Sequence, residues 1–307
     1  MTRPAPCGWL LLDKPVGLSS ARAVSRVKRL FQVKRAGHAG TLDPLASGLL
    51  AIALGPATRW CAYLLDAPKS YRFTIRLGQK TDSHDAESLE KAAPPCAEIP
   101  LLEQAEAQAL LARFTGTIRQ VPPMYSALHS TGRRLYELAR EGKVVDRPAR
   151  EVRIDRLDLV AVRREEWDLE VRCGKGTYVR TLGHDIGRAL GCGAYVSRLR
   201  RTGLGRFDES QAVALETVEA DPGEARPLRL LPADAVLPPG WPVHACTASE
   251  AAALRDGRQV AHGGPTGFWK LEDTQGRFFG VAESLATGRL QPRRLMADPE
   301  NSVQSEP

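Results

Sequence analysis

The sequence lacks any apolar run near the roughly 18 residues that a membrane-spanning helix needs, and residues 9–12 are too few for the core of a signal peptide. Aromatic residues are scarce, at 6%, and there is no internal repeat or low-complexity tract. Because 43% of the residues are hydrophobic and 26% are charged, the composition excludes a disordered or fibrous chain and is typical of a soluble globular protein. We therefore expect a cytoplasmic protein without a membrane partner, and 307 residues are enough for one large domain and a smaller one.

Motifs that would hold a metal ion or a nucleotide phosphate are also missing. The six cysteines are scattered and form no Cys-x-x-Cys pair and no cluster with histidine. Reduced thiols are expected, and neither a zinc site nor a disulfide framework is indicated. The glycine-rich segment 34–48 lacks the Gly-Lys-Ser/Thr ending of a phosphate-binding loop and does not match Gly-x-Gly-x-x-Gly, which disfavours binding of a nucleoside triphosphate.

Acidic residues are nearly absent from the first sixty positions, which hold nine lysines and arginines but only Asp13 and Asp43 as acids. This segment carries the whole net charge of +7, because bases and acids balance in the remainder of the chain. A local positive field favours a polyanionic partner. Solvated helix faces that happen to be basic would give the same count, so charge alone leaves both interpretations open.

Hydrophobic spacing predicts strands and helices along the first part of the chain. Residues 8–12 form a buried strand, and a basic amphipathic helix capped by Ser19 or Ser20 follows it. Residues 70–77 alternate strictly, which places Tyr71 on the inward face of a strand. Residues 101–114 are predicted to form a helix, and residues 133–140 a short basic helix able to clamp a ligand.

The second part of the chain shows a change in pattern. A strand at 167–173 leads through the loop 174–176 into a helix with an apolar stripe. Five prolines between residues 227 and 242 then mark a domain boundary. The short, glycine-punctuated strands that follow predict a small β-rich module, and the last ten residues are expected to be frayed.

Asp43 is the only acid in the segment 34–48, and it precedes Pro44. An Asp-Pro pair commonly begins a type I turn. A lone carboxylate that nearby cations keep ionised is also suited to act as a nucleophile. The residues by themselves favour the turn but leave the nucleophile open.

Three other side chains carry a structural and a functional interpretation. Arg180 begins a helix and is either a surface arginine or a group that points into a cleft. Tyr71 fits the core as well as an active site, and a phenol with a pKa near 10 is a poor base at neutral pH unless its surroundings lower that value. His38 has no second histidine or cysteine nearby, which argues against a metal ligand.

Over about residues 8–297 the chain resembles the bacterial tRNA pseudouridine synthase B (TruB) family. Six segments agree in order, and GTLDP within the second is characteristic of pseudouridine synthases. The segments are LLLDKPVGLSS, RAGHAGTLDPLASGLL, YRFTIRLGQKTDSHDA, VPPMYSALHSTGRRLYELAR, KGTYVRTLGHDIGRALGCGAYV and GRFFGVAESLATGRLQPRRLM.

The resemblance implies an α+β fold, with a pseudouridine synthase core built on a mixed, largely antiparallel sheet flanked by helices and followed by a small β-rich PUA-like domain. Residues 1–230 would form the catalytic domain, in which residues 82–150 include an inserted RNA-clamping segment. Residues 231–297 would form the RNA-binding PUA-like domain, and residues 298–307 a flexible tail.

The resemblance further implies isomerisation of the uridine at position 55 in the TΨC loop of tRNA to pseudouridine. The reaction would proceed by base flipping, without a metal or an organic cofactor. The expected partner is the T-arm stem-loop of tRNA, and no obligatory protein partner is expected. This isomerisation is redox-neutral, so it requires no electron carrier.

Site residues follow from the matched positions. Asp43 falls on the catalytic nucleophile, which attacks either C6 of the uracil or C1′ of the sugar. Tyr71 falls on the active-site tyrosine, Arg180 on the arginine that pairs with the aspartate, and Lys14 on a lysine that supports the site. Tyr71 would stack on the uracil and is a candidate, directly or through water, for removing the C5 proton. Uracil contacts fall on His38, Tyr71, Tyr178 and Leu199. The basic side chains expected to contact the RNA backbone are Arg22, Arg26, Arg29, Lys34, Arg35, Arg198, Arg200 and Arg201.

Two alternative functions are distinguishable from this one. A non-catalytic RNA-binding or RNA-folding protein on the same scaffold would be favoured by loss of Asp43, Tyr71 or Arg180, and all three are present. A phosphate-loop enzyme would bind ATP, which an equilibrium titration would detect.

Overall fold

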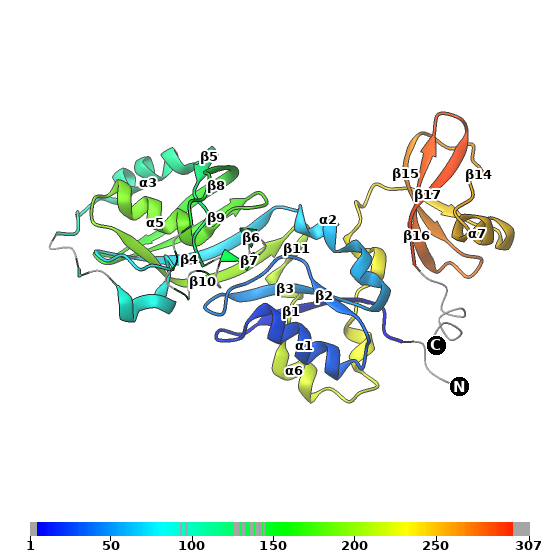
Figure 1. Ribbon diagram of the computed structural model, residues 1–307, viewed down its shortest axis with the longest axis horizontal. Coiled ribbons are helices and arrows are strands. Elements are labelled where there is room, and N and C mark those ends of the chain that lie inside the picture. Colours follow the sequence, from blue (N-terminus) through cyan, green and yellow to red (C-terminus); the bar gives the residue numbers. More distant parts are fainter. Residues whose placement is uncertain are drawn as a thin grey trace.

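The computed structural model describes residues 5–92, 94–95, 98–125, 129–130, 133–135, 138, 141, 143 and 145–296. Within these residues the chain forms a ten-stranded sheet, a five-stranded sheet and a short hairpin of β6 (His129–Ser130) and β7 (Arg133–Arg134). Figure 1 shows the two larger sheets as separate bodies, with the five-stranded sheet at one end of the molecule. The basic helix predicted at 133–140 is wrong at its start, where Arg133–Arg134 form strand β7. Residues 136–137 and 139–140 of that prediction and the tail 298–307 lie outside the described residues.

The large sheet is mixed and mostly antiparallel, which confirms the expected fold class. Its edge-to-edge order is β12 (Val213–Ala214), β1 (Gly8–Lys14), β3 (Ser47–Leu54), β10 (Ala194–Leu204), β4 (Lys69–Leu77), β9 (Glu166–Cys173), β8 (Arg150–Val162) and β5 (Gly116–Gln120). Two short strands extend it, β2 (Ala36–His38) beside β3 and β11 (Phe207–Asp208) beside β10. The pairs β1–β12 and β3–β10 are parallel.

Both faces of β1 and β3 are buried, which explains their nearly continuous apolar sequences. In β1, Leu10 and Leu12 pack into one core, whereas Trp9 and Leu11 pack into another on the opposite face. This division follows from the alternation of side chains along a strand. The first core is covered by the helices α1 (Ser20–Leu30), α3 (Gln104–Leu111), α5 (Val179–Ala189) and α6 (Leu215–Ala220). The second core lies under η1 (Gly55–Trp60), α2 (Cys61–Leu65) and η6 (Ala233–Val236).

The predicted helices are confirmed at α1 and α5, whereas the helix predicted at 101–114 is longer than the observed α3. Ser19 caps α1, since its hydroxyl accepts a hydrogen bond from the backbone nitrogen of Arg22. The predicted helix 101–114 is shortened to α3 because Glu103 caps it in a box with Glu106, and a turn of 3₁₀-helix follows at Ala112–Phe114. Figure 1 shows α1 and α6 next to each other on one side of β1.

The five-stranded sheet follows the proline-rich segment. Its order is β13 (Val243–Ala245), β15 (Gly267–Glu272), β16 (Phe278–Leu285), β17 (Arg289–Leu295) and β14 (Val260–Ala261), with α7 (Ala248–Arg255) packed on it. It has a core of its own that includes Leu254 and Leu290. β16 packs against the second core, in which its Val281 is buried, and the Phe278 ring lies 5.4 Å from the Trp60 ring of η1. None of the helices in the described residues is long and apolar enough to cross a membrane.

Candidate active site

Asp43 stands in a tight turn that the start of α1 holds in place. Its carbonyl oxygen accepts a hydrogen bond from the nitrogen of Ala46 at 3.1 Å, so the turn predicted for the Asp-Pro pair is confirmed. The buried Ser20 hydroxyl both donates to and accepts from the backbone of Leu42, at 2.8 Å in each case. These bonds fix the backbone next to Asp43, so its carboxylate projects from a rigid support.

A cavity of about 280 Å³ lies beside this turn, and we call it the Asp43 cavity. Five of the side chains that the sequence assigned to catalysis or to the uracil line it together, although they come from four separate segments of the chain. They are Asp43, Tyr71 on β4, Tyr178 and Arg180 at the start of α5, and Leu199 on β10. Further lining residues are Lys69, Cys173 and Arg201.

Arg180 connects two carboxylates at the wall of the Asp43 cavity. Its Nε atom lies 2.9 Å from Oδ2 of Asp43 and 3.5 Å from Oδ2 of Asp85. Its Nη1 and Nη2 atoms donate to the carbonyl oxygens of Ser83 and Tyr125, both at 2.7 Å. The guanidinium, which is 3% exposed, is therefore held in one orientation by groups on three sides.

The two carboxylates differ sharply in exposure. The side chain of Asp43 is 35% exposed, whereas that of Asp85 is 1% exposed. Burial raises the pKa of Asp85, an effect that Arg180 and a hydrogen bond from the Ser83 hydroxyl oppose. Asp85 is thus the buried carboxylate that pairs with Arg180, and Asp43 is the carboxylate that faces the Asp43 cavity.

Arg201 contradicts the expectation that it contacts RNA backbone at the surface. It is 1% exposed, and its Nε and Nη2 atoms donate to the carbonyl oxygens of Leu49 at 2.7 Å and Gly40 at 3.1 Å. Gly40 has φ of +91°, and a Cβ atom there would lie 3.3 Å from the Arg201 guanidinium. Arg201 is buried because β10 pairs with β3 opposite Gly48, so the prediction was wrong and the residue is a wall of the Asp43 cavity.

Lys69 and Tyr71 share one face of β4 and meet in the Asp43 cavity. Nζ of Lys69 donates to the carbonyl oxygens of Leu65 and Ala67, at 2.5 and 2.8 Å. Burial and the nearby guanidinium of Arg201 lower the pKa of Lys69 to about 8. Burial raises the pKa of the Tyr71 phenol above its usual value, so the phenol is protonated at neutral pH.

Lys14 and His38 lie near the Asp43 cavity but do not line it. Lys14 is fully buried, and its Nζ donates to the carbonyl oxygens of Pro15 at 2.8 Å and Leu18 at 2.6 Å. It therefore holds the turn before α1, and burial lowers its pKa to about 8 despite the attraction of Asp43. His38 lies on β2, where burial and Arg201 lower its pKa, so its imidazole is neutral at pH 7.

The position of Tyr178 depends on Gln120, a residue that the sequence did not single out. Gln120 is buried at the end of β5, and its side chain pairs with the backbone of Tyr178 through bonds of 3.1 and 3.4 Å. Lys69 was missed as well, although its spacing of two residues from Tyr71 was a usable signal. Asp85 and Ser83 were missed because they lie in an irregular polar segment without periodicity.

The remaining basic residues differ in how they are paired. Arg22, Arg26, Arg29, Lys34 and Arg35 are exposed on α1 and the segment after it. Arg198 is exposed and lies 3.5 Å from Glu166. Arg200 is half-buried and ion-paired with both Asp13 at 2.9 Å and Glu209 at 2.6 Å, so its charge is already neutralised. No group of three potential ligands that could hold a metal ion occurs among the residues that the structure describes.

Models of known protein families match three consecutive parts of the chain. Residues 28–179 match the TruB family pseudouridylate synthase N-terminal domain. Residues 180–237 match the tRNA pseudouridylate synthase B C-terminal domain, and residues 242–296 match the C-terminal domain of pseudouridine synthase II TruB. The three matches leave few residues between 28 and 296 unassigned.

Curated relatives and a solved structure agree with these matches. A tRNA pseudouridine synthase B of Azoarcus sp. (strain BH72) is 45% identical over 299 residues, which cover 94% of this chain and 95% of the relative. One from Chromohalobacter salexigens is 44% identical over 298 residues and 94% of each chain. A chain in the crystal structure of a Cbf5-Nop10-Gar1 complex has the same fold, with a TM-score of 0.69 at 23% identity over 97% of this chain and 87% of that one. From the sequence identity and the family matches together, this chain belongs to the TruB family of pseudouridylate synthases.

Proposed function

We propose that this chain, a tRNA pseudouridine synthase by family, converts the uridine at position 55 in the TΨC loop to pseudouridine with Asp43 as nucleophile. The observation that carries the proposal is the pair of Asp43 and Arg180, 2.9 Å apart, beside a cavity lined by Tyr71 and Leu199. Relatives 44–45% identical are named tRNA pseudouridine synthase B. The reaction needs no electron carrier, because it breaks the bond between N1 and C1′ and joins C5 to C1′ of the same nucleoside, while C5 loses a proton and N1 gains one.

Asp43 supplies the carboxylate that acts as the nucleophile in the proposed reaction. Its carboxylate is partly exposed to the cavity, and Arg180 stabilises its charged form through a direct ion pair. The carboxylate oxygen attacks C6 of the uracil or C1′ of the ribose, and both positions are electrophilic enough for an ionised carboxylate held in place. The guanidinium of Arg180 is itself held in position, because its two terminal nitrogens donate hydrogen bonds to backbone carbonyl oxygens.

Tyr71, Tyr178 and Leu199 form the proposed binding surface for the uracil ring. Leu199 is buried on β10 and Tyr71 lies on the neighbouring strand β4, so both reach the same side of the cavity. An aromatic ring and an aliphatic side chain together exclude water and stack on a planar base. We assign Tyr71 to stacking, because its raised pKa makes a tyrosinate base unfavourable for removing the C5 proton.

Access to the target requires that the uridine leaves its stack, which costs a few kcal/mol. We propose that the neutral imidazole of His38 fills the vacated stack, because His38 lies beside the Asp43 cavity without lining it. The exposed Arg22, Arg26, Arg29, Lys34 and Arg35 would hold phosphates of the T-arm. Lys14 supports the site indirectly, through the backbone before α1.

The test is the variant Asp43→Asn, which keeps the shape of the side chain and removes its charge. We expect pseudouridine formation on a T-arm stem-loop to fall to background, while the equilibrium binding of the stem-loop is retained. Mass-resolved mapping of pseudouridine measures the first quantity, and a filter-binding titration measures the second. Asp256→Asn is the matched control, since Asp256 is exposed and pairs only with a surface arginine on the small domain. Full activity of Asp43→Asn would exclude Asp43 as the nucleophile.

A further inference from the structure

A second cavity, of about 560 Å³, lies next to the Asp43 cavity and shares none of the lining residues given above. We call it the histidine cavity. Its lining residues are His84, Arg113, Phe114, Ile118, Arg119, Val121, Pro122, Arg147, Thr181, His184, Asp185, Arg188 and Ala189. Its volume lies within the range of about 300–1,000 Å³ that is usual for ligand sites. The proposed mechanism uses none of these side chains.

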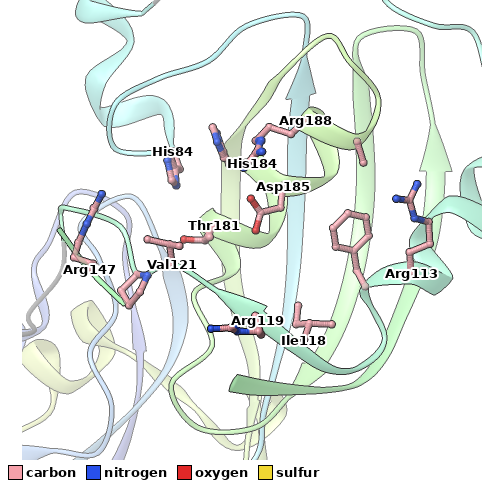
Figure 2. A pocket seen from close by; sticks show the side chains of 13 residues that line it. His84, Arg113, Ile118, Arg119, Val121, Arg147, Thr181, His184, Asp185 and Arg188 are labelled. Atoms are coloured by element: carbon pink, nitrogen blue, oxygen red, sulfur yellow. The ribbon is translucent and has the colours of Figure 1, made fainter. Parts of the chain in front are cut away.

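Two imidazoles form one end of the histidine cavity. The rings of His84 and His184 are stacked, with centroids 4.0 Å apart and planes only 10° from parallel. His84 has φ of +62°, a left-handed backbone conformation that is uncommon for a residue with a side chain. Figure 2 shows the two rings side by side, with Thr181 and Asp185 near His184 on the same helix.

Several polar atoms in the histidine cavity have no hydrogen-bond partner among the described residues. They are Nδ1 of His84, Nδ1 of His184, Oγ1 of Thr181 and Nε of Arg147. Thr181 is the clearest case, because it is only 3% exposed and its hydroxyl borders the cavity. Buried polar atoms are nearly always paired, and each unpaired one costs stability. A ligand with donors and acceptors of its own would pair them.

The charge of the histidine cavity favours an anion. Within the described part of the chain, four arginines line it and only one acid, Asp185, does. Figure 2 shows Arg113, Arg119, Arg147 and Arg188 spread around the cavity rather than gathered at one point. Arginine binds phosphate oxygens through paired donors. Phe114, Ile118, Val121 and Pro122 add an apolar wall that suits a flat ring rather than a bare inorganic ion.

We propose that the histidine cavity binds a phosphorylated nucleoside, with its base against the histidine pair and the apolar wall and its phosphate on the arginines. Stacking of bases on histidine and other planar side chains is a common mode of nucleotide recognition. The unpaired Thr181 hydroxyl would bind the edge of the base. The same chemistry is offered by a nucleotide of an RNA chain and by a free mononucleotide.

The histidine cavity also shares its supporting elements with the Asp43 cavity. Thr181 directly follows Arg180 on α5. His84 stands between Asp85 and Ser83, and the carbonyl oxygen of Ser83 accepts a hydrogen bond from Arg180. An RNA that presents a uridine to Asp43 is thus able to place another of its nucleotides in the histidine cavity. Binding of a nucleotide that belongs to an RNA rests on the proposed function, whereas binding of a free mononucleotide does not.

The experiment uses the full chain with Thr181→Val, which removes one hydroxyl at constant shape, and Arg119→Gln, which removes one charge. The matched controls are Thr217→Val on α6 and Arg164→Gln in the turn between β8 and β9, both exposed and outside the histidine cavity. Thermal melts followed by circular dichroism establish that each variant folds. Because the Thr181 hydroxyl has no partner among the residues that the structure describes, Thr181→Val should not lower the melting temperature.

Binding is measured for the four ribonucleoside 5′-monophosphates and, separately, for a T-arm stem-loop. Saturable binding of a monophosphate that Thr181→Val and Arg119→Gln each weaken by about tenfold, with the controls unchanged, supports a free nucleotide as ligand. Unmeasurable monophosphate binding together with a similar loss of stem-loop affinity in the two variants supports an RNA-borne nucleotide. If neither ligand distinguishes the variants from their controls, the proposal is wrong. Neither readout requires pseudouridine formation, so an inactive enzyme would not obscure the result.

Discussion

At the residue scale, Arg180 is the side chain on which the arrangement of the Asp43 cavity depends most. It pairs with Asp43, which is partly exposed, and with Asp85, which is almost fully buried. An ionised carboxylate in the interior is stable only when it is paired and hydrogen-bonded. Arg180 therefore contributes to the stability of the fold as well as to the charge of the Asp43 cavity.

Replacing Arg180 should separate these two contributions. We expect Arg180→Met to abolish activity and to lower the free energy of unfolding by about 3–5 kcal/mol, because Asp85 loses its cation. The double variant Arg180→Met/Asp85→Asn should recover part of the stability but none of the activity, since Asp43 remains unpaired. Urea denaturation measures the stability, and pseudouridine mapping the activity. Equal stability of the single and double variants would mean that Asp85 does not depend on Arg180.

At the element scale, the close packing of α5 on the sheet determines where Arg180 lies. A Cβ atom built on Gly187 would lie 2.2 Å from the backbone nitrogen of Ala194, and one on Gly183 would lie 2.8 Å from a methyl group of Val196. Both contacts are with β10, so α5 approaches this strand more closely than a helix with larger residues could. The glycines are needed for this approach and not for helix formation, which they disfavour.

Gly187→Ala tests the packing of α5. The added methyl group meets backbone atoms that cannot move aside, so we expect a loss of about 1–3 kcal/mol in the free energy of unfolding. Activity should fall as well, because Arg180 and Tyr178 move with the helix. Gly223→Ala is the matched control, since a Cβ atom at Gly223 has no neighbour within 4 Å and should change the stability by no more than about 0.5 kcal/mol. If the unfolding curve of Gly187→Ala matches that of the unmodified protein, α5 can shift without a loss in the free energy of unfolding.

At the scale of the whole molecule, the basic excess of the sequence divides into a surface part and an internal part. The cations of α1 and of the segment after it are exposed, and they belong to the first sixty residues that hold the net charge of +7. The sequence grouped Arg200 and Arg201 with these cations. In the structure, Arg200 is half-buried and ion-paired, and Arg201 is buried. We therefore propose that α1 carries the phosphate-binding surface and that Arg200 and Arg201 do not contribute to it.

The salt dependence of RNA binding tests this division. The affinity for a T-arm stem-loop should fall steeply between low and moderate salt, because phosphate contacts release counterions. Arg22→Gln and Arg29→Gln should each reduce the slope of log affinity against log salt by about 1. Arg200→Gln should leave the slope unchanged, since Asp13 and Glu209 already neutralise Arg200. If the affinity of the unmodified protein does not change with salt concentration, α1 is not the surface that binds the RNA.

The local pattern of the sequence determined much of this architecture. Alternation predicted the strand that carries Tyr71, because side chains on a strand point to opposite faces in turn. Ser19 and the spacing after it predicted α1, because a hydroxyl at that position satisfies free backbone donors. Six motifs predicted the family, since each is a local string that needs no knowledge of the fold. Asp43 stood out as one acid in a basic, glycine-rich segment, but its surroundings alone favoured a turn, and only the family resemblance assigned it the role of nucleophile.

The tertiary structure alone decided which side chains meet. Asp43 and Arg180 lie far apart in the sequence, and only the packing of α5 and the parallel pairing of β3 with β10 bring them within 2.9 Å. The same pairing buries Arg201 and leaves Arg200 on the opposite face of β10, although the two are adjacent and chemically identical. Composition and spacing describe neighbours along the chain, whereas burial and ion pairing depend on neighbours in space. The sequence therefore determined the elements, and the fold decided which cations surround Asp43.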